Sequence, residues 1–215
     1  MNSVCPLCQH SQTQIFCSDK KRAYFQCQQC FLVFADRTTL LTAEQEKAQY
    51  DLHQNQLDDL GYRKFLSRLA SPLLSMLRPE QNTGLDFGCG PGPLLAHMLR
   101  EAGKEMQVWD PFYAPEPIAL QRKYHFVSCT EAIEHFINPA KEWHLWLNLL
   151  QPEGVLALMT KRYTDKNSFH NWHYKNDPTH ISFFHQRTFE FLAQRDRLEL
   201  EFPADDVVIF KKRNT

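Results

Sequence analysis

From residue 83 onward, the chain alternates short apolar runs with longer segments whose apolar residues recur at helical spacing. The apolar runs are rich in aromatic and β-branched residues and predict strands, whereas the amphipathic segments predict helices. The predicted strands cover 83–87, 106–110, 124–129, 155–161, 198–202 and 205–212. The predicted helices cover 93–103, 139–154 and 186–197. This alternation is typical of an α/β fold with a mostly parallel, doubly wound sheet, to which the final hairpin adds an antiparallel strand.

Residues 38–82 carry a different, largely helical pattern. Thr42 stands where a helix cap is expected, with a glutamine three residues later, and 61–79 has apolar residues at helical spacing. We expect a helical linker that covers a pocket of the main domain. Three polar side chains are candidates for lining this cover, with a solvated helix face as the alternative for each: Tyr50, His53 and Asn55.

The first 37 residues contain two CxxC pairs, at 5–8 and 27–30. Each pair forms a tight turn that directs two thiolates at one centre, and four thiolates arranged tetrahedrally suit zinc. Aromatic and apolar segments at 23–27 and 31–35 flank the second pair and predict the short strands of a zinc ribbon. Four cysteine ligands leave no open coordination position, which favours a structural zinc over a catalytic one. The predicted zinc ligands are Cys5, Cys8, Cys27 and Cys30.

Composition narrows the classes of partner and compartment. The formal net charge is −1, and basic residues cluster only at 20–22 and 211–213, which argues against a partner held by nucleic-acid phosphates. No apolar run is long enough to span a bilayer, and the first residues lack the charged and apolar regions of a signal peptide. Reduced, metal-binding cysteines suit the cytoplasm, so we expect a cytoplasmic protein without a membrane partner.

The segment "LDFGCGPGPLL" (85–95) joins a predicted strand to a predicted helix through three alternating glycines. Glycine permits positive φ angles and close approach of a ligand, and the helix N-terminus offers free N–H groups to a negative group. Asp110 ends the next strand about 20 residues later, where an acidic side chain is placed to bind a ribose diol. The glycine pattern alone is ambiguous, but together with Asp110 it predicts a ribose-containing cofactor.

Four motifs together carry a family resemblance: "LDFGCGPG" (85–92), "VWDP" (108–111), "FVSCTEAIEHFINP" (126–139) and "LLQPEGVLALMT" (149–160). In combination they resemble class I S-adenosylmethionine-dependent methyltransferases, which have a Rossmann-like fold. The resemblance implies S-adenosylmethionine as the cofactor, with Asp110 on its ribose. It also implies contacts to the methionine end from Asp86, Gly88, Gly90 and Gly92. Cys89 stands between two of these glycines and is counted with the cofactor-binding residues, with a small core side chain as the alternative.

One departure from the family pattern follows Asp110. Only fourteen residues, 111–124, separate Asp110 from the start of the next apolar run, where the family fits a helix, a strand and another helix. Pro115 and Pro117 disfavour a strand in this segment. We therefore expect a sheet that is abridged after its second strand. The usual adenine contact then has no counterpart, and Phe112 is the candidate neighbour of the adenine.

Two carboxylates and an imidazole follow the strand predicted at 124–129: Glu131, Glu134 and His135. If a helical turn starts at Thr130, these side chains share one face at the carboxyl edge of the sheet, where ligands bind. The segment 169–185 follows the next strand and brings four histidines to the same edge, any of which could supply a fourth ligand: His170, His173, His180 and His185. Two oxygen and two nitrogen ligands there suit a divalent cation, and the same groups suit acid–base catalysis.

This arrangement is similar to that of the small-RNA 3′-terminal 2′-O-methyltransferases, and its ExxEH part also occurs in ubiquinone-pathway O-methyltransferases. The resemblance implies that Glu131, Glu134, His135 and His180 bind a second divalent cation and act in catalysis. Two alternatives stay open. The same residues can act on the acceptor without a metal, or they can form a structural turn in which Glu134 is exposed. Trp172 and Tyr174 either form an aromatic wall of the acceptor site or pack against the neighbouring helix.

The sequence therefore predicts a zinc ribbon at 1–37, a helical linker or cover at 38–82 and a methyltransferase domain at 83–215. The expected activity is O-methylation of a small hydroxylated molecule by S-adenosylmethionine, assisted by a cation. RNA or tRNA methylation, methyl transfer to a sugar carbon or nitrogen, and a non-enzymatic S-adenosylmethionine sensor are the alternatives. The sequence specifies neither the acceptor nor the oligomeric state.

Overall fold

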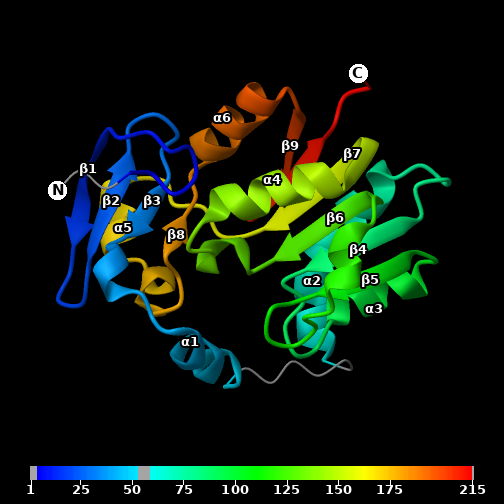
Figure 1. The fold of residues 1–215 in the computed structure, drawn as a ribbon, viewed down its shortest axis with the longest axis horizontal. Helices are drawn as coiled ribbons and strands as arrows, with labels where there is room; N and C mark the ends of the chain where they lie inside the picture. Colours follow the sequence, from blue (N-terminus) through cyan, green and yellow to red (C-terminus); the bar gives the residue numbers. More distant parts are fainter. Residues whose placement is uncertain (1–3, 53–58, 215) are drawn as a thin grey trace.

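The structure, a computed structural model, describes residues 4–52 and 59–214. It contains a six-stranded sheet and a four-stranded sheet beside it (Figure 1). The larger sheet has the strand order β5-β4-β6-β7-β10-β9. Its strands are β4 (Thr83–Phe87), β5 (Glu105–Trp109), β6 (Tyr124–Thr130), β7 (Leu150–Met159), β9 (Glu199–Ala204) and β10 (Val207–Lys211).

Parallel pairing joins β5, β4, β6 and β7, while β10 runs antiparallel between β7 and β9. This topology confirms the predicted α/β fold with a mostly parallel sheet and an antiparallel strand from the final hairpin. From β4 the chain moves outward to β5 and then returns to β6 on the other side of β4. Parallel sheets bind ligands at such a switch point, outside the carboxyl ends of the strands.

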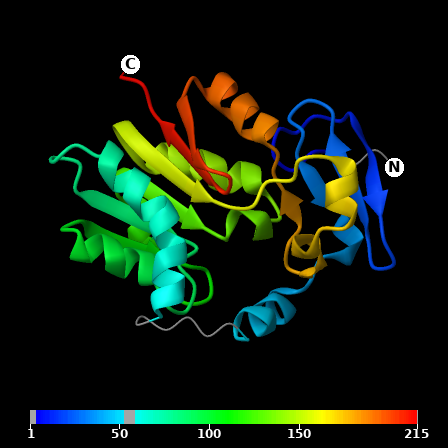
Figure 2. The ribbon, with the colours of Figure 1, turned by 180° about the vertical axis from the view of Figure 1, so that it is seen from behind.

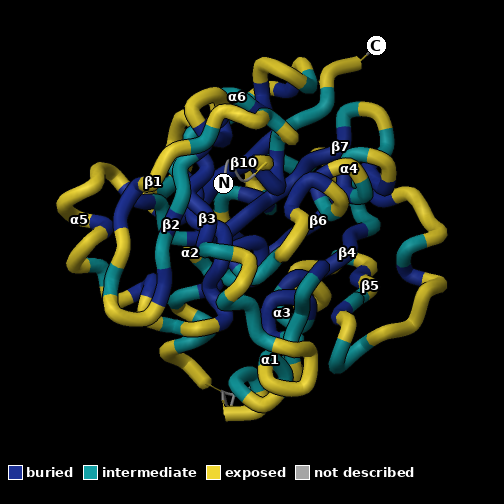
Figure 3. Tube along the Cα trace, turned by 60° about the vertical axis from the view of Figure 1, so that its left-hand side comes forward, coloured by how far each residue is buried: buried dark blue, intermediate teal, exposed yellow. Residues whose placement is uncertain are grey.

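Helices cover both faces of this sheet, as expected for a doubly wound fold. The helices α2 (Leu60–Met76) and α3 (Leu94–Glu101) share one apolar core with the sheet, and α4 (Pro139–Leu149) and α6 (Gln186–Asp196) share the other. Figures 1 and 2 show α4 and α2 on opposite sides of the sheet. The strands between them are buried along most of their length, which Figure 3 shows as dark tube at the centre of the molecule. Continuous burial explains why these strands are near-continuous apolar runs in the sequence.

The sheet is abridged after its second strand, as predicted. Within residues 110–123, all of which are described, the chain forms an isolated bridge between Asp110 and Ala114 and the 3-10 helix η2 (Pro117–Gln121), but no strand. The hydroxyl of Tyr124 donates to the carbonyl of Ala119 at 2.7 Å and fastens η2 to the core. The strand β5 is therefore an edge strand of the sheet, next to β4.

The smaller sheet has the order β1-β2-β3-β8 and is antiparallel throughout. Its strands are β1 (Thr13–Ser18), β2 (Ala23–Cys27), β3 (Val33–Ala35) and β8 (Ser182–Phe183). The sequence predicts β2 and β3 but misses β8, which is too short to show a pattern of period two. Because β8 completes this sheet, hydrogen bonds of the main chain join the N-terminal region to the rest of the fold. The division of the chain after residues 37 and 82 stays a prediction.

The segment between the two sheets is helical where the structure describes it. It contains the 3-10 helix η1 (Arg37–Thr39) and α1 (Ala43–Tyr50). Thr42 caps α1 and forms a capping box with Gln45, as the sequence predicts. Two of the candidate cover residues, His53 and Asn55, lie outside the described residues. The remaining short helices are η3 (Ile133–His135), α5 (Lys166–His170) and η4 (His173–Asn176).

The helix predicted over 139–154 is shorter in the structure. The helix α4 ends at Leu149, and β7 begins at the next residue, Leu150. Pro152 explains the difference, because proline has no N–H for a helical hydrogen bond and favours extended backbone in the residue before it. Among the helices of the described residues, none combines the length and the apolar character that a membrane span requires.

Gly84 in β4 tests how tightly the central strands pack. A Cβ atom at this position would lie 2.2 Å from the ring of Phe126 and 2.7 Å from the sulfur of Met106. We expect Gly84→Ala to lower the free energy of unfolding by about 1–3 kcal/mol, because a packed core accepts an added methyl group only with strain. Urea denaturation measures this, with Gly61→Ala in the first turn of α2 as the matched control. Equal stability of the two variants would contradict the close packing of β4.

Candidate active site

A cavity of about 770 Å³ lies at the carboxyl ends of β4, β5 and β6. This volume is in the usual range for small-molecule and cofactor sites, about 300–1,000 Å³. The glycine loop after β4, Asp110 after β5 and the Glu/His segment after β6 contribute to its lining. Aromatic side chains of the helical linker complete it: Tyr50 of α1, and Tyr62 and Phe65 of α2. The predicted cofactor loop and the predicted Glu/His cluster therefore meet in one cavity.

The glycine loop brings its backbone close to the cavity. Gly88, Cys89 and Gly90 belong to the lining, whereas Gly92 does not. Gly88 has a φ of 74°, and a Cβ atom there would lie 2.7 Å from the Cβ of Ala132, so this position requires glycine. The N–H of Gly90 donates to Oδ2 of Asp110 at 3.0 Å, which fixes the loop to the end of the neighbouring strand.

Asp110 organises the cofactor side of the cavity. Its side chain is 7% exposed, and its Oδ1 accepts hydrogen bonds from the N–H groups of Phe112 and Tyr113 at 2.9 and 3.1 Å. A carboxylate has about four acceptor positions, and three hydrogen bonds already occupy those of Asp110, so about one position is left for a ribose hydroxyl. Phe112 lines the cavity beside it, with its ring 5.9 Å from that of Tyr50.

Asp86 lies behind the glycine loop and not at the cavity wall. It is 2% exposed and is absent from the lining. The hydroxyl of Ser128 donates to its Oδ1 at 2.8 Å and so links β4 to β6. Burial raises the pKa of the Asp86 carboxyl to about 6. In the structure Asp86 supports the strand that carries the loop, and its contact with the cofactor stays a prediction.

Glu131 occupies a left-handed backbone position, with a φ of 47°. The prediction of a helical turn that starts at Thr130 is wrong, because η3 begins only at Ile133. The N–H of Glu131 donates to the carbonyl of Met159 at 2.8 Å, so sheet pairing extends to Glu131 before the chain turns. Its side chain lines the cavity, and its Oε1 is buried and has no hydrogen-bond partner in the described part of the chain. Burial, together with the charge of nearby Glu134, raises the pKa of the Glu131 carboxyl to about 9.

Glu134 is fully buried, at 0% exposure. The hydroxyl of Thr160 donates to its Oε2 at 2.9 Å, and the hydroxyl of Tyr174 donates to its Oε1 at 2.5 Å. Burial raises the pKa of Glu134, while nearby His180 and these hydrogen bonds oppose the rise. The alternative in which Glu134 is exposed is therefore wrong. The ring of Tyr174 stacks on Trp172 at 4.8 Å and neither residue lines the cavity, which favours packing over an acceptor wall.

His135 and His180 come from different segments of the chain and bring ligand atoms to the same region. Nδ1 of His135 lies 3.2 Å from the carbonyl of Thr179, and Nδ1 of His180 lies 2.7 Å from the carbonyl of Tyr174. A carbonyl accepts a hydrogen bond only from a protonated nitrogen, so the lone pair of each neutral ring is on Nε2. Burial lowers the pKa of His180, which favours the neutral ring. One ligand atom each from Glu134, His135 and His180 lie within 4.8 Å of one another.

Sequence reasoning missed two residues of this cluster. Thr160, the hydroxyl donor to Glu134, follows β7 directly and looks in the sequence like an ordinary strand end. Asp177 lines the cavity, and its Oδ2 lies 3.9 Å from Nε2 of His180. In the sequence Asp177 precedes a proline, a combination that indicates only a turn. Glu131, in contrast, is a predicted ligand that lies outside the group of three.

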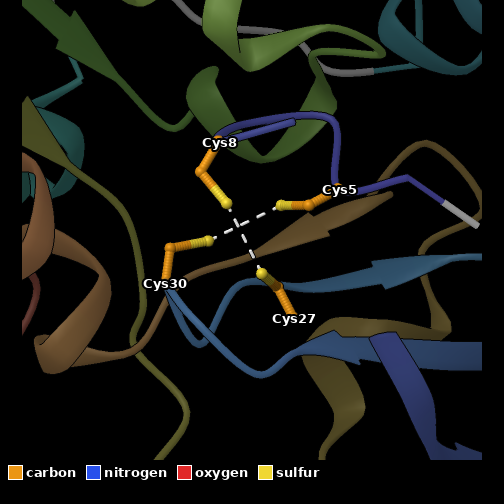
Figure 4. Close-up of side chains that lie close together, drawn as sticks. All are labelled: Cys5, Cys8, Cys27 and Cys30. Carbon is orange, nitrogen blue, oxygen red and sulfur yellow. Dashed lines mark hydrogen bonds between the residues drawn. The ribbon is translucent and has the colours of Figure 1, made fainter. Parts of the chain in front are cut away.

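The four cysteines of the two CxxC pairs converge, as Figure 4 shows. The Sγ atoms of Cys5 and Cys30 lie 3.5 Å apart, as do those of Cys8 and Cys27. All four sulfur atoms lie within 4.8 Å of one another. The turn between the first two cysteines also contacts the main fold, where the N–H of Ala140 in α4 donates to the carbonyl of Pro6 at 3.3 Å.

Comparison with known families identifies the class of the protein. A family described as "Methyltransferase domain" matches residues 56–200, which is more than half of the chain. The chain belongs to this family. It is an S-adenosylmethionine-dependent methyltransferase, in agreement with the glycine loop and the acidic strand end beside it. Curated protein sequences give no significant match to the chain.

Solved structures share the fold. An O-methyltransferase family protein from Burkholderia thailandensis is 15% identical, with a TM-score of 0.58 over 83% of this chain. This chain spans 66% of the length of that protein. The plantazolicin methyltransferase BpumL, solved with a triazolic desmethyl-plantazolicin analogue and S-adenosylhomocysteine, is 12% identical with a TM-score of 0.51, over 80% of this chain and 91% of its own. The mitomycin 7-O-methyltransferase MmcR is 11% identical with a TM-score of 0.50, over 70% and 54%. At these identities the similarity shows a common fold.

Asp110→Asn tests the cofactor side of the site. The amide removes the charge that holds Gly90 and would face the ribose, and hydrogen bonds to a charged group contribute about 1.5–3 kcal/mol. We expect the affinity for S-adenosylmethionine to fall by about 10- to 100-fold. Titration calorimetry measures this, with Glu116→Gln, an exposed carboxylate of the same segment, as the control. An unchanged affinity in Asp110→Asn would remove Asp110 from the cofactor site.

Proposed function

We propose that this methyltransferase methylates a hydroxyl oxygen of a small molecule and that a divalent cation held by the Glu/His cluster assists the reaction. One observation carries the proposal: the glycine loop, Asp110, Glu134 and His180 line the same cavity. A methyl donor along the loop and a hydroxyl at the cluster would therefore share one enclosed space. Proximity of this kind is the main requirement of methyl transfer, because the sulfonium methyl is already electrophilic.

The donor chemistry of the cluster fits a divalent cation. Glu134 offers a carboxylate, and His135 and His180 offer Nε2 lone pairs. The Nδ1 atom of each histidine faces a backbone carbonyl, which is the usual arrangement of metal-binding histidines. Glu131 lies outside this group of three but lines the same cavity, and its buried carboxylate oxygen, which has no hydrogen-bond partner among the described residues, makes it the candidate fourth ligand. Imidazole and carboxylate ligands together suit cations such as Mn²⁺, Fe²⁺, Co²⁺ and Zn²⁺.

The chain's own tasks are to orient the acceptor and to take up its proton. A cation at the cluster would lower the pKa of a bound hydroxyl and hold it in place. In the metal-free alternative, the Nε2 lone pair of His180 or His135 accepts the hydroxyl proton while the acceptor oxygen bonds to the methyl group. The S–C bond of the sulfonium breaks in the same step, and the neutral thioether S-adenosylhomocysteine leaves. Chelation separates these two mechanisms, because only the first depends on a removable cation.

A small acceptor is favoured by the lining of the cavity. Tyr50, Tyr62, Phe65 and Phe112 present aromatic surface, which suits an acceptor with an apolar body and a hydroxyl group. The net charge of −1 provides no general attraction for nucleic-acid phosphates. Methylation of RNA or tRNA, and methyl transfer to a sugar carbon or nitrogen, are the rival activities. The cytoplasm is the compartment we propose for the reaction.

We also propose that the four N-terminal cysteines bind a structural zinc ion. A Zn–S bond of about 2.3 Å in a tetrahedron separates the sulfur atoms by roughly 3.8 Å. The observed separations of 3.5 Å support this geometry. The four cysteines would fill the coordination sphere, so the ion would stabilise the fold of the N-terminal sheet and take no part in methyl transfer.

The cation proposal predicts a second, exchangeable metal site in the zinc-loaded protein. We expect Mn²⁺ to bind with a stoichiometry of about one, and Glu134→Gln and His180→Ala to weaken it by at least about 10-fold, because each removes a ligand. Electron paramagnetic resonance of free Mn²⁺ measures the affinity. His170→Ala, an exposed histidine of α5, is the control and keeps the wild-type affinity.

Activity is tested with a metabolite pool and S-adenosylmethionine labelled in its methyl group. Label should enter a hydroxylated small molecule, and mild chelation should abolish the transfer while Mn²⁺ restores it. Transfer that survives both chelation and the Glu134→Gln substitution would overturn the cation mechanism. Label found in RNA, or on carbon or nitrogen of the product, would overturn the O-methylation of a small molecule.

The zinc proposal predicts about one zinc ion per chain that resists mild chelation, since a closed site exchanges slowly. Cys30→Ser should lose this zinc and destabilise the fold, because Cys30 is fully buried among the other cysteines. Elemental analysis and thermal unfolding measure both effects. Cys17→Ser is the control, a buried cysteine of β1 outside the group of four. A zinc content that is unchanged in Cys30→Ser would contradict the assignment.

A further inference from the structure

The N-terminal sheet contacts the loop that carries His180. We infer that Arg22, the residue before β2, positions this loop, residues 174–181, and thereby sets the geometry of the acceptor side of the cavity. The inference deepens the proposed function and rests on it for the role of the cation. The N-terminal sheet then has a role beyond the proposed zinc binding, because it supports the loop that contacts the Glu/His cluster.

Arg22 binds the loop through its backbone carbonyls. Its Nη2 donates to the carbonyls of Lys175 and Asp177 at 2.6 and 2.8 Å, and its Nη1 donates to the carbonyl of Pro178 at 3.2 Å. The side chain is only 9% exposed, so water cannot readily replace these bonds. The planar guanidinium has fixed donor directions, and three carbonyls bound to it therefore have a fixed relative position.

Two residues of the N-terminal region hold Arg22 in place. Its Nε donates to the hydroxyl of Tyr24 at 2.9 Å, and the N–H of Arg22 donates to the carboxylate of Asp19 at 3.0 Å. Asp19 also pairs with Lys175 of the loop, whose Nζ lies 2.7 Å from Oδ2 of Asp19. Lys175 is 5% exposed, so this pair is shielded from solvent on the loop side. Arg22 donates to the carbonyls of the loop, and Asp19 pairs with Lys175 of the loop. Both contacts tie the loop to the turn between β1 and β2.

The loop in turn contacts three members of the Glu/His cluster, Glu134, His135 and His180. The carbonyl of Tyr174 faces Nδ1 of His180, and the hydroxyl of Tyr174 donates to Glu134. The carbonyl of Thr179 faces Nδ1 of His135. The N–H of Ile181 donates to the backbone carbonyl of Glu134 at 2.9 Å. A shift of the loop would therefore move the histidine rings and remove a donor from the buried carboxylate.

The same contacts weaken the nucleic-acid alternative. Arg22 is one of the three residues of the basic cluster 20–22, and its guanidinium donates inward to the loop. Lys20 and Lys21 are the members of that cluster that remain exposed. Hydrogen bonds within the chain therefore account for the position of Arg22, and no nucleic-acid phosphate is needed to explain it.

Arg22→Met in the zinc-loaded protein tests the inference, because methionine removes the donors and keeps an unbranched apolar stem. Hydrogen exchange of residues 174–181 should accelerate by about 10-fold or more, as expected when a held segment opens locally. Mn²⁺ affinity should fall by about 10- to 100-fold, as for other groups that orient metal ligands. Zinc content and S-adenosylmethionine affinity should not change, since the Arg22 side chain donates to Tyr24 and to the loop 174–181, whereas Asp110 holds the glycine loop.

Arg187→Met is the matched control. Arg187 is exposed in the first turn of α6, and its guanidinium lies 3.6 Å above the ring of Phe31 near the second CxxC pair, away from the loop. The inference is overturned if exchange in 174–181 is the same in Arg22→Met as in Arg187→Met. If Arg22→Met fails to fold, Arg22→Lys decides, because lysine keeps the charge but not the fork. Wild-type exchange and Mn²⁺ affinity in Arg22→Lys would overturn the inference, and intermediate values support it. If the wild-type protein binds no Mn²⁺, the cation part of the proposed function fails, and the exchange comparison still decides on Arg22.

Discussion

The fully buried carboxylate of Glu134 is the constraint on which the arrangement of the site depends. A carboxylate without water is costly unless its neighbours donate hydrogen bonds or carry opposite charge. Thr160 at the end of β7 and Tyr174 of η4 both donate to it, and His180 stands beside it. Three parts of the chain that are distant in sequence are therefore held at one point. The proposed cation would offset the charges of Glu134 and Glu131 together, which gives a physical reason for two acidic groups with raised pKa values at one cavity.

The two halves of the cavity have different supports. On the cofactor side, the missing third strand leaves Asp110 to organise both the glycine loop and the turn at Phe112 and Tyr113. On the acceptor side, residues 174–181 are held by the N-terminal sheet through Arg22. The N-terminal sheet is therefore more than an appendage in this chain, since its strand β3 pairs with β8 and Arg22 donates to the loop of the cluster. The donor and acceptor sides can in this way be perturbed separately.

Patterns that are local in sequence were sufficient for most of the fold. Apolar runs predict the strands of the large sheet, and the CxxC pairs predict the convergence of four cysteines. The features that were missed depend on contacts between distant residues. The left-handed turn at Glu131 follows from its hydrogen bond to Met159, which the spacing of Glu131 and Glu134 does not reveal. The strand β8 exists because β3 pairs with it, and Asp177 gains its place at the cavity from its loop.

The proposed function requires that the methyl donor and a divalent cation occupy the same cavity. Nuclear magnetic resonance of S-adenosylmethionine labelled with ¹³C in its methyl group tests this directly, with the protein saturated by the donor and titrated with Mn²⁺ in place of diamagnetic Mg²⁺. If both share the cavity, we expect Mn²⁺ to broaden the bound methyl resonance strongly, and we expect His180→Ala to lose this broadening. A methyl resonance that stays sharp while both Mn²⁺ and the donor are bound would contradict it.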